Sequence, residues 1–139
     1  MTPLLPKILR AQPIIFDKEI IEGKSLVSPT PISPLGDIDP RTGRIIDPQS
    51  SIRGESVKDK ILVAPYFRGS TVGSYILFAL SKYKVAPKAI IVGRIDPMLV
   101  AGCVLGNIPL VELEDYEKIP SNAKILLVKI NDEVEVRVK

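Results

Sequence analysis

Histidine and tryptophan are absent from this 139-residue sequence, and cysteine occurs once, at Cys103. Without histidine the chain has no Ser-His-Asp or Cys-His catalytic pair, no histidine-ligated metal site and no phosphohistidine. One cysteine excludes a disulfide within the chain, and it cannot by itself hold an iron–sulfur cluster. Chemistry in this chain must therefore use hydroxyls, carboxylates, lysine or arginine, or a cofactor held by a partner.

Several partner classes are also disfavoured. The 19 basic and 16 acidic residues leave a net charge of only +3, and aromatic residues make up 5%. So small a positive charge and so few aromatic residues argue against nucleic-acid binding. No apolar run approaches the roughly 18 residues of a membrane span. The first 13 residues, with prolines at 3, 6 and 13, lack the long apolar segment of a signal peptide. We expect a cytoplasmic protein that binds neither nucleic acid nor membrane.

The length suits a single domain over residues 1–139, and its first third is rich in proline. Prolines at 3, 6, 13, 29, 31, 34, 40 and 48 exclude long helices there but permit strands, which we expect over 12–17 and 24–28. Residues 31–56 are rich in turn formers and predict a long loop. The isoleucines of this loop indicate that it is ordered and packed on the domain.

The rest of the chain alternates between two periodicities. Apolar residues at 72, 75, 76, 79, 80 and 83 predict a helix over 70–84, and Asp96-Pro97 predicts the start of a second, buried helix over 98–105. Cys103 falls inside that apolar helix and is predicted to be a core residue rather than a nucleophile. Short apolar runs predict strands over 60–66, 88–92 and 108–113, and a hairpin over 123–130 and 134–138.

This order predicts an α/β fold. Strand, helix, strand, helix, strand gives two βαβ units with parallel strands and right-handed crossovers. The N-terminal strands form a β layer, and the C-terminal hairpin completes the domain.

The main candidate site is the segment 68–74, Arg-Gly-Ser-Thr-Val-Gly-Ser, between the first strand of this series and its helix. Ligands of parallel sheets bind at the carboxyl ends of the strands, and a helix N-terminus favours an anion. Gly69 permits close backbone approach, and Ser70 and Thr71 supply hydroxyls. Arg68 supplies a planar cation for carboxylate or phosphate. The same residue types suit a simple N-cap at Ser70, so both interpretations stay open.

A second candidate site lies in the 31–56 loop, where four residues combine hydroxyl, carboxylate and glycine: Ser33, Asp39, Thr42 and Gly43. Their chemistry could bind a substrate. The pattern is equally typical of a solvated turn. No residue of the chain is proposed as a metal ligand.

Linked motifs in these two regions resemble the small subunits of the aconitase X family, of the archaeal phosphomevalonate dehydratase type. The resemblance extends over nearly the whole chain. It rests on Pro31, Ser33, Gly36, Asp39-Pro40, Thr42-Gly43, Ile45-Ile46-Asp47, Gly54, Ser56-Val57, 60–63 and 68–74, followed by Asp96-Pro97, Gly106 and 108–111. It implies the aconitase-like swivelling β/β/α domain, paired with a large subunit that carries an iron–sulfur cluster.

The resemblance also implies a reaction, the dehydration of (R)-5-phosphomevalonate to trans-anhydromevalonate 5-phosphate. In aconitase-like enzymes the serine at the position of Ser70 acts as an alkoxide base on the carbon next to the carboxylate, while the cluster iron assists departure of the hydroxyl. Arg68 would stabilise that alkoxide or bind a substrate anion. Aconitases proper carry an arginine where this chain has Val72, which disfavours a tricarboxylate substrate.

Three other functions stay open. The chain could be a non-catalytic swivelling module that closes or regulates a partner's site, or the small subunit of a related dehydratase of hydroxyproline-type substrates. It could also be a small-anion-binding domain without a partner.

Overall fold

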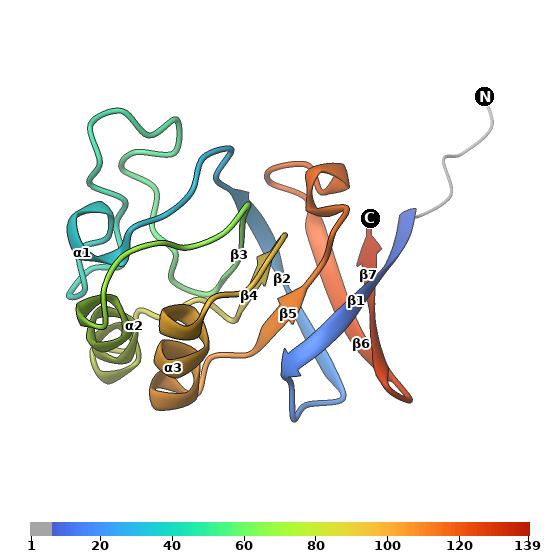
Figure 1. The fold of residues 1–139 in the computed structure, drawn as a ribbon. Coiled ribbons are helices and arrows are strands. Elements are labelled where there is room, and N and C mark those ends of the chain that lie inside the picture. Colours follow the sequence, from blue (N-terminus) through green and yellow to red (C-terminus); the bar gives the residue numbers. More distant parts are fainter. Residues whose placement is uncertain (1–6) are drawn as a thin grey trace.

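The computed structural model describes residues 7–139, so Pro3 and Pro6 lie outside the described residues. The described part forms one closed barrel of seven strands in the order β1-β5-β4-β3-β2-β6-β7. The strands are β1 (Lys7–Ile15), β2 (Ile20–Val27), β3 (Lys60–Ala64), β4 (Ala89–Val92), β5 (Leu110–Glu112), β6 (Lys124–Ile130) and β7 (Glu133–Val138). Two main helices and a long loop cover one end, and β6 and β7 form the other (Figure 1).

Half of the barrel is parallel. Strand β3 pairs with β2 on one side and with β4 on the other, and β4 pairs with β5, all in parallel. Residues 61–64 and 89–92 are buried throughout, because core side chains cover both faces of these strands. Helix α2 (Val72–Lys82) connects β3 to β4, and helix α3 (Pro97–Gly106) connects β4 to β5.

The other half of the barrel is antiparallel. Strands β6 and β7 form the predicted hairpin, and β7 pairs with β1 while β6 pairs with β2. The N-terminal strands predicted as a β layer, β1 and β2, belong to the same closed barrel as the parallel strands. Closure explains the difference, because pairing both N-terminal strands with the hairpin removes the exposed edges that a layer of their own would leave.

The 31–56 loop is ordered and packs on the helical end, as its isoleucines predicted. Ile32, Ile38, Ile45 and Ile52 are all buried in the core cluster that also includes Leu77 of α2. A short, kinked helix, α1 (Pro34–Asp37), lies within the loop and contacts α2. Thus the loop is part of the core around the first βαβ unit, and it places its polar residues beside α2.

The two main helices pack closely through small residues. A Cβ atom added at Gly102 of α3 would lie 2.5 Å from Leu77 Cδ1 and 3.1 Å from the Cα of Ser74, so only glycine fits this approach. The hydroxyl of Ser74 donates to the carbonyl oxygen of Met98 at 2.8 Å, within the buried contact. Both helices therefore begin side by side, next to the carboxyl ends of β3 and β4.

Candidate active site

A cavity of about 680 Å³ lies where α2 and α3 begin. Three segments form its walls: the turn after β3, the turn after β4, and the first turns of the two helices. Its lining residues are Tyr66, Phe67, Arg68, Gly69, Thr71, Ser74, Arg94, Asp96, Pro97, Met98 and Ala101. Gly69 and Thr71, on either side of Ser70, reach this cavity, so the predicted turn borders a hollow of substrate size.

Ser70 is exposed in this turn and does not cap the helix with its side chain. The predicted helix start at residue 70 is early by two residues, because Thr71 occupies the N-cap position in a helical conformation with no side-chain cap bond. Ser70 instead accepts a hydrogen bond from the N–H of Gly73 through its carbonyl oxygen, at 2.9 Å. The geometry therefore does not support the interpretation of Ser70 as the N-cap of α2.

Gly69 gives the turn its shape. Its φ of +130° lies in a region that residues with a side chain rarely adopt, and no atom lies within 4 Å of a Cβ added there. Glycine is thus favoured at position 69 by the backbone conformation and not by a lack of space for a side chain. A side chain at position 69 would strain the turn and move Ser70.

The structure brings Ser33 and Arg68 together, although they are 35 residues apart. The backbone of Ile32 bonds to this turn in both directions, accepting from the N–H of Arg68 at 2.9 Å and donating to the carbonyl oxygen of Tyr66 at 3.2 Å. The Nε of Arg68 donates to the Ser33 hydroxyl at 3.3 Å, and the Ser33 N–H donates to Asp37 Oδ2 at 2.7 Å. Ser33 is therefore placed to orient the Arg68 guanidinium.

The other three loop candidates lie at the opposite end of α2. Asp39 and Thr42 accept backbone N–H groups within their own turn, at 3.0 Å from Arg41 and 3.2 Å from Arg44. A Cβ added at Gly43 would lie 2.9 Å from the carbonyl oxygen of Val85, which follows α2. The 11 residues of α2 span about 16 Å, so the structure does not bring Asp39, Thr42 and Gly43 to the Ser70 turn.

Arg94 also lines the cavity, and it was not among the residues predicted from the sequence. Its guanidinium carbon lies 4.0 Å from the centroid of the Tyr66 ring, and both side chains line the cavity. A signal was available, because Arg94 follows the second parallel strand as Arg68 follows the first. The carboxyl ends of neighbouring parallel strands lie at the same edge of a sheet, which predicts that the two turns meet.

Asp96 caps α3, as predicted, by accepting a hydrogen bond from the N–H of Leu99 at 2.8 Å. Its second oxygen, Oδ2, is buried and has no hydrogen-bond partner within residues 7–139. Asp96 therefore adds negative charge beneath the cavity and presents little of it to the opening.

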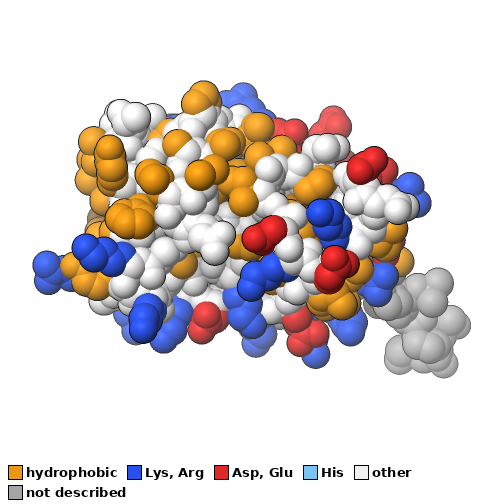
Figure 2. Space-filling model, turned by 90° about the horizontal axis from the view of Figure 1, so that it is seen from below, with side chains coloured by type: hydrophobic (Ala, Val, Ile, Leu, Met, Phe, Trp, Pro, Cys, Tyr) orange, Lys and Arg blue, Asp and Glu red, His pale blue; other side chains and the backbone are white. Residues whose placement is uncertain are grey.

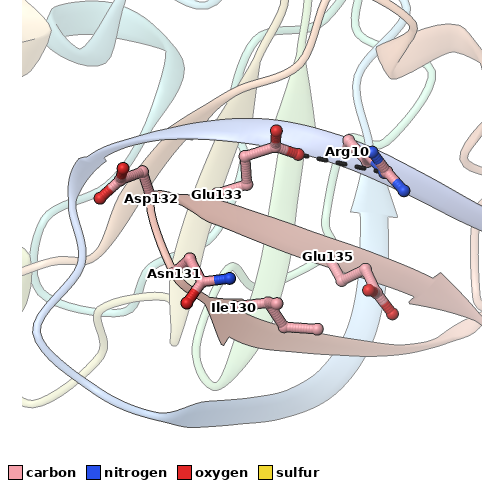
Figure 3. Close-up of a pocket in the computed structure, with 6 residues that line it drawn as sticks. All are labelled: Arg10, Ile130, Asn131, Asp132, Glu133 and Glu135. Atoms are coloured by element: carbon pink, nitrogen blue, oxygen red, sulfur yellow. Dashed lines mark ion pairs between the residues drawn. The ribbon is translucent and has the colours of Figure 1, made fainter.

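A second hollow, of about 340 Å³, lies beside the β6–β7 hairpin (Figure 3). Arg10 of β1 contacts Glu133 there, with Nε 4.0 Å from Oε2, and the remaining charged lining residues are Asp132 and Glu135. This excess of carboxylates repels an anionic ligand. The cavity at the helix N-termini, which has two arginines, is the better site for a phosphorylated acid.

Exposed apolar side chains gather on the helical end of the molecule, at the upper left of Figure 2. They belong to adjacent elements: Leu35 of α1, Val72, Tyr75 and Phe78 of α2, and Val104 and Leu105 of α3. We call this set the helical face. Pro97 and Ala101 of α3 line the cavity, and exposed apolar side chains gathered on one face are typical of an interaction site.

Comparison with known proteins decides the family. Residues 8–138 match the family model of the aconitase X swivel domain. A phosphomevalonate dehydratase small subunit from Pyrococcus abyssi is 48% identical over 119 residues, which are 86% of this chain and 92% of that protein. The chain belongs to the aconitase X swivel-domain family. A protein of the same name from Methanopyrus kandleri is 44% identical over 102 residues, 73% of this chain and 76% of that protein.

The fold of this aconitase X swivel domain is also found in a crystal structure of Thermococcus kodakaraensis aconitase X in its holo form. The TM-score is 0.83 at 39% identity, covering 94% of this chain and 98% of that one. Among the helices of residues 7–139, none combines the length and the apolar character needed to span a membrane.

The described residues of this swivel domain do not fit an iron–sulfur cluster. Residues 7–139 contain no group of three or more His, Cys, Asp or Glu side chains arranged to hold a metal ion. Cys103, the sole thiol, is buried in α3, where burial and then the nearby Asp96 carboxylate raise its pKa to about 12. A thiol held neutral in this way is a poor metal ligand, because metal binding requires the thiolate.

Proposed function

We propose that this chain is the small subunit of a cytoplasmic hydro-lyase that converts (R)-5-phosphomevalonate into trans-anhydromevalonate 5-phosphate and water, with Ser70 as the proton acceptor. The observation that carries the proposal is the exposed Ser70 in a glycine turn beside a cavity with two arginines. The relatives are named phosphomevalonate dehydratase small subunits, and from that name we take the substrate and the existence of a large subunit.

The proposed step is a proton transfer followed by loss of hydroxide. The Ser70 alkoxide takes a proton from the carbon next to the substrate carboxylate. The electron pair of the broken C–H bond forms the new C=C bond, and the hydroxyl on the neighbouring carbon leaves with its bonding pair. The departing hydroxide and the proton taken by Ser70 together make up the released water, which regenerates the alkoxide. We assign assistance to the leaving hydroxyl to the large subunit.

A serine hydroxyl is a weak acid, so its alkoxide must be stabilised strongly. The N-terminus of α2 directs its partial positive charge at the turn, and the capping position leaves that charge without a side-chain partner. Arg68, the adjacent cation, is oriented by its bond to Ser33. We assign Arg68 to stabilising the alkoxide, which becomes more effective once a partner excludes water from the cavity.

The helical face supports the proposal of a partner. Tyr75 and Phe78 are 65% and 41% exposed, and they lie on the helix that begins at the Ser70 turn. Because α2 and α3 both begin at the cavity, we propose that a subunit that covers the helical face also closes the site. We propose that the large subunit, carrying the iron–sulfur cluster expected for the family, docks here.

The test is reconstitution with the large subunit and an assay of phosphomevalonate dehydration. We expect Ser70→Ala to assemble normally and to lower kcat about 10³-fold, the loss typical of a missing acid–base group. Ser51→Ala is the matched control, because Ser51 is exposed in the loop away from the cavity lining. Full turnover by Ser70→Ala would show that the chain is a non-catalytic swivelling module. Turnover of hydroxyproline-type substrates alone would indicate a related dehydratase.

A further inference from the structure

We propose that Arg94, stacked on Tyr66, binds the substrate phosphate, and that this contact selects the phosphorylated acid. The inference rests on the proposed function for the identity of the substrate. It separates the two arginines of the cavity by role: Arg68 acts at the reacting end of the substrate, and Arg94 acts at its other end.

The stacking geometry prepares Arg94 for an anion. Its guanidinium lies over the face of the Tyr66 ring, with 4.0 Å between the guanidinium carbon and the ring centroid. Stacking occupies the flat face of the guanidinium and leaves the N–H donors at its edge free. Tyr66 is half-buried and thus a fixed support, so Arg94 loses less conformational freedom on binding than an unsupported arginine.

No carboxylate neutralises either arginine of the cavity. Within residues 7–139, neither Arg94 nor Arg68 lies within 4.0 Å of an Asp or Glu oxygen, whereas Arg10 and Arg137 both form ion pairs. Asp96 is the remaining charged residue of the lining. Its Oδ1 is used by the N-terminus of α3 and its Oδ2 is buried, so the opening presents two cations. A substrate with an anionic group at each end complements that charge, with its phosphate at Arg94.

The spacing of the two strand ends is of the same order as the length of the substrate. In phosphomevalonate five bonds separate the carbon that loses the proton from the phosphorus, a span of about 6 Å when extended. Ser70 follows β3 and Arg94 follows β4, and these two strands are direct parallel neighbours. Neighbouring strands are about 4.8 Å apart, and the long Arg94 side chain covers the rest. In our proposal the substrate lies across the two strand ends, with its reacting carbon toward the Ser70 turn and its phosphate toward Arg94.

The experiment uses the reconstituted two-subunit enzyme and the variants Arg94→Gln and Arg94→Lys. We expect Arg94→Gln to raise the KM for phosphomevalonate and the inhibition constant of inorganic phosphate by roughly 10- to 100-fold, since charge-assisted bidentate contacts are lost. The kcat and the inhibition constant of unphosphorylated mevalonate should stay within about twofold of the wild type. Arg94→Lys should restore part of the loss, because the charge remains but the stacked fork does not.

Arg41→Gln is the matched control. The Arg41 guanidinium also lies over a tyrosine, 5.9 Å from the Tyr83 ring centroid, but at the other end of α2. It should leave every one of these constants unchanged. The proposal is overturned if inorganic phosphate does not inhibit the wild type, or if Arg94→Gln leaves the inhibition constant of phosphate unchanged. It is also overturned if Arg94→Gln raises the inhibition constant of mevalonate as much as the KM for phosphomevalonate.

Failure of the proposed function would look different. If the wild-type assembly does not dehydrate phosphomevalonate, calorimetric titration of the same assembly with inorganic phosphate still compares wild type with Arg94→Gln. Weaker phosphate binding by the variant would support the Arg94 site. Equal binding would reject it.

Discussion

The hydroxyl of Ser74 in α2 donates to the carbonyl oxygen of Met98 in α3, at 2.8 Å. Ser74 is 3% exposed, so the bond is shielded from water. It joins the first turns of the two helices that begin next to Ser70 and Arg94. A second bond of the same kind, from the Ser81 hydroxyl to the carbonyl oxygen of Gly106 at 2.6 Å, joins the C-terminal ends of the same helices.

These two bonds allow stability to be separated from site geometry. We expect Ser74→Ala and Ser81→Ala each to lower the free energy of unfolding by about 1 kcal/mol, the usual net contribution of one such bond. Only Ser74→Ala should also raise the KM for the phosphorylated substrate several-fold, because it loosens the two turns of the cavity. Denaturant unfolding measures the free energy of unfolding of the two variants, and steady-state kinetics measures their KM. An equal effect of both variants on KM would contradict a positioning role for Ser74.

The Ser33–Arg68 bond predicts a modest catalytic effect at a residue far from Ser70 in the sequence. Ser33→Ala removes the acceptor of Arg68 Nε, and we expect kcat to fall about fivefold, consistent with loss of an exposed hydrogen bond. Thr42→Ala is the control, since its hydroxyl bonds the backbone of Arg44 instead. It should leave kcat unchanged. A similar fall in both variants would show that the loop acts only through its general stability.

The helical face predicts where the subunits assemble. Tyr75→Ser combined with Phe78→Ser should raise the dissociation constant for the large subunit at least tenfold, because large aromatic side chains dominate interface energies. Ile130→Ser is the control, since Ile130 is similarly exposed, at 39%, but lies on the β6–β7 hairpin. Titration of the purified subunits measures both. Weaker assembly in Ile130→Ser alone would place the interface at the hairpin instead.

Cys103 predicts a pH effect of defined sign. Burial, with a smaller contribution from Asp96, raises the pKa of its thiol from the ordinary value of 9.0 to about 12 in the folded chain. Between these values the unfolded chain loses the thiol proton and the folded chain keeps it, so the free energy of unfolding falls as the pH rises. Below the ordinary pKa of the thiol, both states keep the proton and stability does not depend on this group.

Cys103→Ala tests the effect through the slope rather than the absolute stability, because the variant also leaves a small cavity. Its free energy of unfolding should fall less steeply between pH 9.0 and about pH 12 than that of the wild type. In the native wild type, Cys103 should react with thiol reagents near neutral pH only as fast as the protein unfolds. Rapid labelling of the folded protein would contradict the burial of this thiol.

Much of the secondary structure could be predicted because it depends on local pattern. The apolar spacing of 72–83 identified α2, and the Asp96-Pro97 pair identified the start of α3. The strand boundaries were predicted less exactly, since β1 starts at Lys7 and not at residue 12. Residues 7–11 form a strand by pairing with β7, at the other end of the chain. Strand pairing between the two ends of the chain has no local signal.

The sequence by itself determined the chemistry of this chain. The absence of histidine leaves hydroxyls, carboxylates, lysine and arginine as its candidate reactive and binding groups. The glycine turn at 68–74 brings two hydroxyls and an arginine together, because a strand, a glycine and a helix in succession form such a turn locally. The tertiary structure decided which other residues join Ser70. It joined Ser33 to Arg68, separated Asp39, Thr42 and Gly43 from them by the length of α2, and added Arg94 through the pairing of β3 with β4. These placements depend on packing and strand pairing between distant segments, where the energy of burial rather than local backbone preference selects the neighbours.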